Sequence, residues 1–151
     1  MISVPVQAIC NTILLKSFEE NINVTPMKLQ KLLYFVYKDY LQRTGNQLFT
    51  ERFETWQYGP VLSSVYAEFC SFRANRITKL AKNADGSAIF ISDDGAPDIM
   101  RSINDVWNKY KGMNGIQLSN ITHSEGSAWY KAFKNEKAFL DNEDIKGDYV
   151  G

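Results

Sequence analysis

The sequence contains one histidine, His123, followed directly by Ser124 and Glu125, residue types that could supply a nucleophile and an acid or base. A serine nucleophile needs a histidine base, and that histidine must itself be oriented by a third group. Adjacent residues rarely point at one another in this way, and no G-x-S-x-G turn surrounds them. We therefore predict that His123 fixes a loop or contacts a partner, that Ser124 or Ser127 caps a helix, and that the protein is not an enzyme. A hydrolase using His123 is the last alternative.

No other set of side chains is suited to catalysis or to binding a metal or cofactor. The acidic pairs Glu19-Glu20 and Asp93-Asp94 have no histidine near them, and the glycines are too scattered for a phosphate-binding loop. Cys10 and Cys70 stand alone, which excludes a CxxC site and a disulfide framework. We expect no cofactor and no metal, and a function in binding.

Charge and hydropathy argue against nucleic acid and membranes as partners. The 17 basic and 17 acidic residues give a formal net charge of zero. Lys28, Lys31 and Lys38 beside Phe35 form the best basic patch, but three lysines on a solvated helix face are ordinary. The N-terminus has no signal-peptide pattern, and no apolar run approaches the roughly 20 residues of a membrane span. We expect a cytoplasmic protein.

One long helix is expected to position the candidate residues. Thr25-Pro26 is a strong helix start and Gly45 a stop, which predicts a helix over 26–44. Its apolar residues cover two adjoining faces and leave a narrow polar stripe, so we expect it to be central. The first face holds Leu29, Leu32, Leu33, Val36 and Tyr40, the second holds Gln30, Tyr34, Tyr37 and Leu41, and the stripe holds Lys28, Lys31, Phe35, Lys38 and Gln42.

Shorter elements are expected around this helix. Ser3 and Pro5 predict a first helix that ends near Asn21 or Asn23, with an apolar face including Phe18. We further predict an extended piece over 52–58, a helix from Pro60 to about 74, a hairpin of "RITKL" and "AIFIS" around an Asp-Gly turn, and helices over 97–112, 116–122 and 127–134, with at most one helical turn in the last ten residues. The expected fold is mainly α (α+β): one domain, 1–151, of about five to seven helices around a central helix, with a small β-hairpin.

The stretch "FETWQYGPVLSSVYAEF" concentrates aromatic residues around a Gly-Pro step. Helical spacing directs Val61, Val65 and Phe69 inward. Trp56 and Tyr58 lie just before the turn, where an aromatic ring with a polar tip serves either the core or an interface.

Three segments resemble the signature blocks of the Panacea domain family. They are "MKLQKLLYFVY" (27–37), "LF...F.TWQYGPVLSSVYAEF" (48–69) and "LSNITHSEGSAW" (118–129), in the family's order and spacing. Gly126-Ser127 departs mildly from the usual Ser-Pro-Trp ending of the third block. The motif positions in this chain are Lys28, Leu29, Gln30, Leu32, Leu33, Gly59, Pro60, Val61, Tyr66, Thr122 and Trp129.

The resemblance implies an antitoxin that neutralises a cognate, adjacently encoded toxin by direct protein–protein contact. A related member acts as an adaptor to a protease, so delivery of a toxin or client to a protease subunit is an alternative; a phage or prophage accessory protein that binds a host factor is another. We expect the toxin to contact a polar-aromatic rim of Lys31, Tyr34, Trp56, Tyr58 and His123. The apolar circumference of the central helix could also bury against a second copy, which would give a homo-oligomer.

Overall fold

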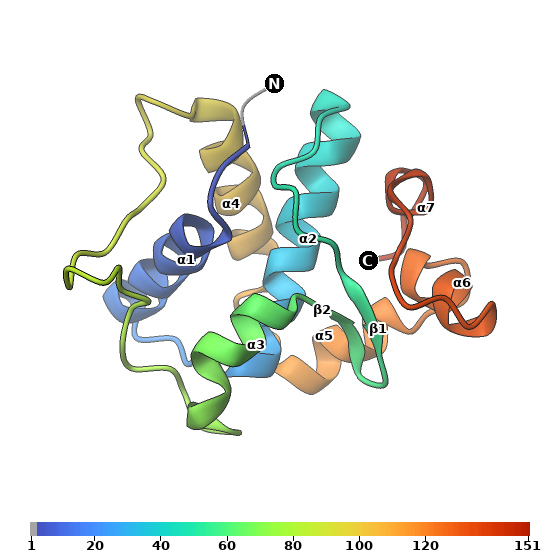
Figure 1. The fold of residues 1–151 in the computed structure, drawn as a ribbon, viewed down its shortest axis with the longest axis horizontal. Helices are drawn as coiled ribbons and strands as arrows, with labels where there is room; N and C mark the ends of the chain where they lie inside the picture. Colours follow the sequence, from blue (N-terminus) through green and yellow to red (C-terminus); the bar gives the residue numbers. More distant parts are fainter. Residues whose placement is uncertain (1–2) are drawn as a thin grey trace.

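The computed structural model describes residues 3–151, which form mainly helices and one small sheet (Figure 1). The helices are α1 (Val6–Glu20), α2 (Pro26–Thr44), α3 (Ser63–Phe69), α4 (Pro97–Tyr110), α5 (Gly115–Thr122), α6 (Ala128–Lys134) and α7 (Asn142–Lys146), with a 3-10 turn η1 (Cys70–Phe72) after α3. The antiparallel strands β1 (Glu54–Trp56) and β2 (Gly59–Val61) make the sheet. The predicted fold class, mainly helical with a small β-hairpin, is confirmed. Among residues 3–151, no helix combines the length and apolar character needed to cross a membrane.

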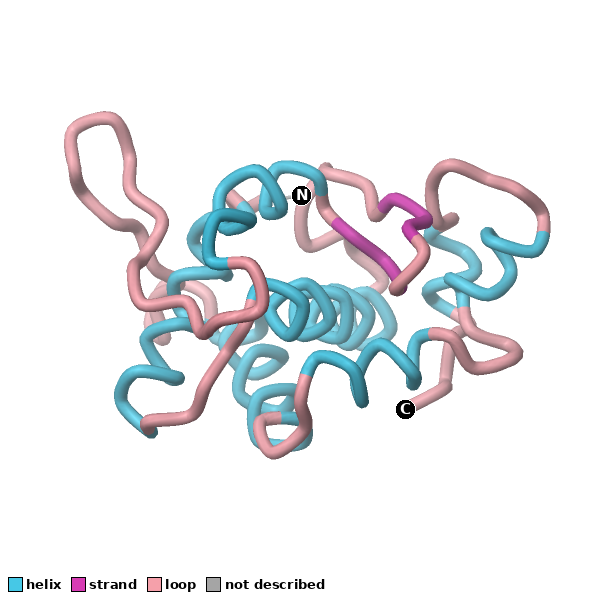
Figure 2. The backbone as a smooth tube through the Cα atoms, turned by 90° about the horizontal axis from the view of Figure 1, so that it is seen from below, coloured by secondary structure: helices cyan, strands magenta, loops and turns pink. Residues whose placement is uncertain are grey.

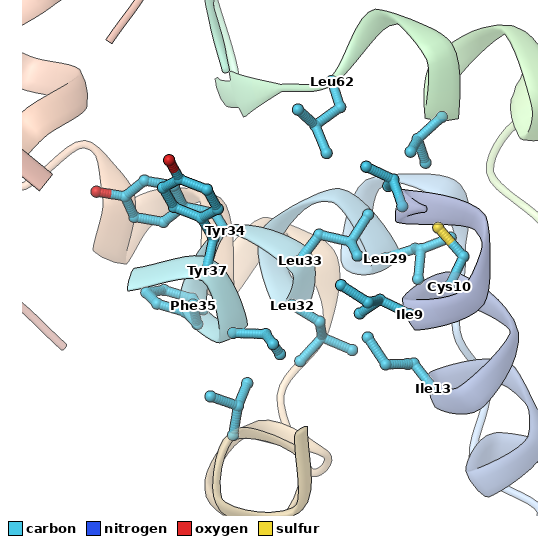
Figure 3. Close-up of a cluster of buried hydrophobic side chains, with 14 of the residues drawn as sticks. Ile9, Cys10, Ile13, Leu29, Leu32, Leu33, Tyr34, Phe35, Tyr37 and Leu62 are labelled. Atoms are coloured by element: carbon cyan, nitrogen blue, oxygen red, sulfur yellow. The ribbon is translucent and has the colours of Figure 1, made fainter. Parts of the chain in front are cut away.

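Helix α2 is the centre of the fold, and its bounds agree with the prediction. The Thr25 hydroxyl accepts a hydrogen bond from the backbone N–H of Lys28, and Gly45 ends the helix in the left-handed conformation at φ 77°. The other helices surround α2, which runs nearly end-on through the middle of the molecule in Figure 2. Figure 3 shows Ile9 and Ile13 of α1 directed at Leu29, Leu32 and Leu33 of α2.

The expected solvated stripe on α2 is wrong, because every residue from Lys28 to Lys38 is buried. Phe35 stacks on Tyr110 of α4 with ring centroids 4.4 Å apart. The lysine stems pack along apolar surface while their ammonium groups reach backbone carbonyls. Lys28 donates to the carbonyl of Lys111, Lys31 to that of Pro60 and Lys38 to that of Val150, so each lysine holds a distant segment against α2.

The hairpin is not where the alternating pattern predicted it. Residues 76–92 contain no strand, because α1 takes up the backbone groups that a ladder would use. The Asn11 amide donates to the carbonyls of Ala81 and Ile89 and accepts from the Ala81 N–H, and Thr12 accepts from the Ile91 N–H. The loop is therefore pinned to a helix instead of pairing with itself.

The observed hairpin occupies the Gly-Pro step that was predicted to open a helix. Pro60 lies in β2 opposite Thr55, and α3 begins only at Ser63. Gln30 explains the delay: its side chain donates to the Leu62 carbonyl and accepts from the Leu62 N–H, which holds this backbone extended.

Two details of α1 also differ from the sequence prediction. The helix starts after Pro5 and has no side-chain cap, so Ser3 does not cap it. Phe18 was expected on the inner face but is 41% exposed. The end of α1 agrees: Asn21 follows it in the left-handed conformation at φ 54°.

Candidate functional site

A groove of 510 Å³ lies between the start of α2, the β-hairpin and α3, and we call it the hairpin groove. Most of its lining residues are apolar or aromatic, and none carries a carboxylate. They are Pro26, Met27, Gln30, Lys31, Trp56, Gln57, Tyr58, Val61, Val65, Tyr66, Cys70 and Arg73. A concave, mainly apolar surface with few polar groups is the usual form of a binding site.

Exposed aromatic rings form the mouth of the hairpin groove. Tyr58, in the two-residue turn of the hairpin, is 60% exposed, and Tyr66 on α3 is 50% exposed. Trp56 is half-buried, packs against Tyr66 with centroids 5.0 Å apart, and donates its indole N–H to Glu54 at 3.2 Å. Exposed aromatics beside a concavity are the residue type enriched in protein interfaces.

The floor of the groove is built by α2. The Gln30 amide holds Leu62 by the two hydrogen bonds described above, at 3.0 and 2.9 Å. Lys31, only 1% exposed, donates to the Pro60 carbonyl at 2.9 Å. Burial lowers the pKa of Lys31 to about 7, because desolvation disfavours the ammonium form. Gly59 leaves room for this side chain: a Cβ there would lie 2.8 Å from Lys31 Cε and 2.6 Å from Thr122 Oγ1.

Residues of α5 and α6 support the hairpin from behind. The Ser119 hydroxyl donates to the Tyr58 carbonyl, and the Trp129 indole donates to the Trp56 carbonyl at 2.8 Å. The His123 ring lies 4.1 Å from the Trp129 ring, measured between centroids. The third signature block therefore fixes the position of the two aromatic residues at the mouth of the groove.

His123 itself is half-buried and shows no catalytic arrangement. Desolvation is the main cause that lowers the pKa of His123, and the positive charge of Lys31 lowers it further. The backbone of Gln57 raises the pKa and partly opposes both effects. Its Nε2 atom has no hydrogen-bond partner among residues 3–151. Ser127, not Ser124, is the helix cap: its hydroxyl accepts from the Tyr130 N–H and donates to the Thr122 carbonyl. Within the described part of the chain, no group of three or more metal-ligating side chains is found.

Tyr34 belongs to a separate buried network, one helical turn along α2 from Gln30 and Lys31. Its hydroxyl donates to Asp148 at 2.6 Å, and Asp148 also accepts from the Ala128 N–H and lies 3.7 Å from the Lys38 ammonium. Burial, followed by the charge of Asp148, raises the pKa of Tyr34 well above its usual value. The final residues of the chain are thereby tied to α2.

The structure brings together only some of the residues predicted to bind a partner. Lys31, Trp56 and Tyr58 line the hairpin groove, His123 lies behind it, and Tyr34 does not reach it. Lys31 and Tyr34 are each 1% exposed, so as the chain is folded here they have no surface to offer a toxin. Contact of all five residues with a toxin stays a proposal, and the exposure seen here favours Trp56, Tyr58 and His123 among them.

The sequence analysis missed several lining residues of the groove. Tyr66 is a motif position without a predicted contact role, Val65 is predicted to point into the core, and Met27 has no prediction of its own. Arg73 falls within the helix predicted from Pro60 to about residue 74 and received no role of its own, because a single arginine near a helix end carries no sequence signal; in the structure it follows η1. The clustering of aromatic residues around Gly59-Pro60 was the signal that pointed to this region.

Most of the chain is similar in sequence to known proteins. Residues 29–130 match the family described as "Antitoxin SocA-like, Panacea domain". Antitoxin SocA of Caulobacter vibrioides (strain NA1000 / CB15N) is 32% identical over 130 residues, covering 84% of this chain and 69% of that protein. No solved structure matches the chain. The matched range runs from the first turn of α2 into α6, and so includes the hairpin, α3 and α5.

Proposed function

Because the chain belongs to the family of SocA-like antitoxins with a Panacea domain, we propose that it neutralises a cognate toxin by direct protein–protein contact. Membership gives it an antitoxin role in a toxin–antitoxin system and implies a toxin as partner. In this proposal residues 1–151 act as one Panacea-type antitoxin domain, and the toxin docks at the hairpin groove.

The observation that carries the docking site is the exposed aromatic mouth of the groove. Burying Tyr58 and Tyr66 under a partner would remove large apolar surfaces from water, and this is the main favourable term in protein association. The backbone around them is already held, because Ser119 bonds to Tyr58, Trp129 to Trp56 and Gln30 to Leu62, so little ordering is required on binding. A pre-organised aromatic surface favours tight capture of a partner.

The simplest mechanism is occlusion, in which the hairpin groove covers part of the toxin surface and no further component is needed. A toxin held at the groove would have the bound part of its own surface covered, and no chemical step by the antitoxin is required. Family membership is in keeping with a non-enzymatic role. Under occlusion the toxin would stay intact and inactive.

The proposal is tested by growth rescue with the neighbouring toxin gene. The small open reading frame next to this gene is expressed from an inducible promoter, with and without this chain. Relief of toxicity, together with co-purification of the two proteins at unchanged toxin levels, supports neutralisation by occlusion. A toxic neighbour that is neither relieved nor bound would refute the proposal.

The same experiment separates the two alternatives. If the toxin disappears in the presence of this chain, and persists in cells that lack one cytoplasmic protease, the chain is a proteolytic adaptor. If no toxic gene lies nearby and the purified chain instead retains a host protein, the accessory role in phage or prophage biology replaces the antitoxin mechanism proposed here.

A further inference from the structure

We propose that the toxin segment that enters the hairpin groove is apolar and carries one aspartate or glutamate side chain, which pairs with Arg73. This inference rests on the proposed function and names the chemistry of the partner. It is carried by three features of the groove: its charge, the backbone conformation of Arg73 and the distribution of apolar residues along its walls.

The charge of the groove is uncompensated. Its lining contains one exposed basic side chain, Arg73, and no carboxylate; the other basic residue, Lys31, is buried beneath it. Arg73 is exposed and makes no ion pair with any residue between 3 and 151. The acidic residue of the hairpin, Glu54, does not line the groove and accepts the Trp56 indole N–H. A guanidinium beside an apolar surface is best complemented by a carboxylate, which it can bind with two parallel hydrogen bonds.

Arg73 is held at the mouth of the groove by a strained backbone. It closes η1 with φ 56° and ψ −121°, and its N–H donates to the Cys70 carbonyl at 3.0 Å. A non-glycine residue in this conformation costs about 1–3 kcal/mol, and such strain is concentrated at functional sites. Glycine would adopt the same backbone without strain. The backbone conformation alone would thus be met more easily by glycine, and a contact of the exposed arginine side chain with a partner would offset the strain.

The walls of the groove favour an internal segment of the toxin over its C-terminal carboxylate. Apolar or aromatic residues line the α2 side, with Pro26 and Met27, and also the hairpin and α3 side, with Trp56 and Tyr66. An internal segment places apolar side chains on both flanks of one acidic residue, whereas a chain terminus has residues on one flank only. We therefore assign the carboxylate to an aspartate or glutamate side chain.

Arg73→Gly separates this role from a structural one. We expect the variant to unfold at the same or a higher denaturant concentration than the wild type, since the backbone strain is relieved. Its affinity for the toxin that the wild-type chain neutralises in the growth-rescue experiment should fall by about tenfold to a hundredfold, as expected for loss of a charged hydrogen bond. Arg73→Glu should weaken binding further. Lys82→Glu is the control for Arg73→Glu, because it also replaces a basic by an acidic side chain but lies outside the groove, and it should leave the affinity nearly unchanged.

The partner residue is identified by charge reversal in the toxin. Each exposed aspartate and glutamate of the toxin is changed to arginine and tested against Arg73→Glu, and one of these changes should restore binding. Wild-type affinity in both Arg73 variants would overturn the inference while leaving neutralisation by contact intact. Restoration only by altering the toxin's C-terminal carboxylate would also overturn it. Failure of the wild-type chain to bind the toxin would instead remove the proposed function, and the inference with it.

Discussion

Replacement of the buried Lys31 by methionine should change how the stability of the protein depends on pH. The pKa of Lys31 falls from 10.5 to about 7 on folding, because the ammonium group is desolvated. Between these two values the unfolded chain binds more protons than the folded chain, so the contribution of Lys31 to stability becomes more favourable as the pH rises. Below about pH 7 its full cost is present, and above about pH 10.5 it is gone.

The magnitude follows from the pKa difference. At about 1.4 kcal/mol for each tenfold change in proton affinity, the drop to about 7 corresponds to about 5 kcal/mol of destabilisation at low pH. Between about pH 7 and about pH 10, roughly 3 kcal/mol of this cost is released. Lys31→Met removes the titration and also the hydrogen bond to Pro60, a loss of about 1–3 kcal/mol that does not depend on pH.

The assay is urea unfolding of the wild type and of Lys31→Met, followed by circular dichroism at several pH values from about 7 to 10. The variant should be the more stable protein near pH 7 and should lose this advantage, by about 3 kcal/mol, as the pH rises. Other groups that titrate in this range are present in both proteins, so their effects cancel in the difference. Lys79→Met, at an exposed position, is the control and should give a constant difference. A constant difference for Lys31→Met would show that Lys31 is not desolvated and would refute the reasoning.

Three further predictions follow from the geometry of the groove. Gln30→Ala should lower the free energy of unfolding by about 1–3 kcal/mol in urea titrations, because the buried Leu62 N–H loses its partner while the Leu62 carbonyl keeps only the Tyr66 N–H; a cost below about 0.5 kcal/mol would contradict a stabilising role for the Gln30–Leu62 hydrogen bonds. Gly59→Ala should destabilise by at least about 2 kcal/mol in the same assay, because φ is 116° and the new Cβ would overlap two side chains; unchanged stability would contradict the close packing. Tyr58→Ala should unfold like the wild type but bind the toxin at least about tenfold more weakly in calorimetry, whereas Tyr149→Ala, 81% exposed and outside the groove, should bind normally. Equal affinities would remove Tyr58 from the site.

Local signals were sufficient for α2 and for the start of α4. Thr25-Pro26 and Gly45 gave the bounds of α2, and Pro97 gave the start of α4, since capping and proline geometry act within one turn of the chain. The family assignment from three sequence blocks is likewise confirmed. The strand pattern failed, because alternating residues at 76–92 have the same appearance whether they pair with each other or with the Asn11 side chain of a distant helix.

In the candidate site too, some residues could be predicted from local sequence and others could not. Trp56 and Tyr58 were found because aromatic residues around a Gly-Pro step carry a composition signal that needs no tertiary context. The burial of Lys31 could not be found in this way, because a helical pattern shows that a lysine lies on the polar side but not whether another segment covers it.

The sequence by itself determined the helical architecture, the central place of α2 and the family, because caps, periodicity and motifs are properties of neighbouring residues. Only the tertiary structure decided that the lysine side of α2 is covered, where the hairpin forms and that Arg73 joins the aromatic residues at one groove. Those outcomes depend on hydrogen bonds and packing between residues far apart in the chain, such as Gln30 with Leu62. Local preferences are too weak to anticipate such contacts.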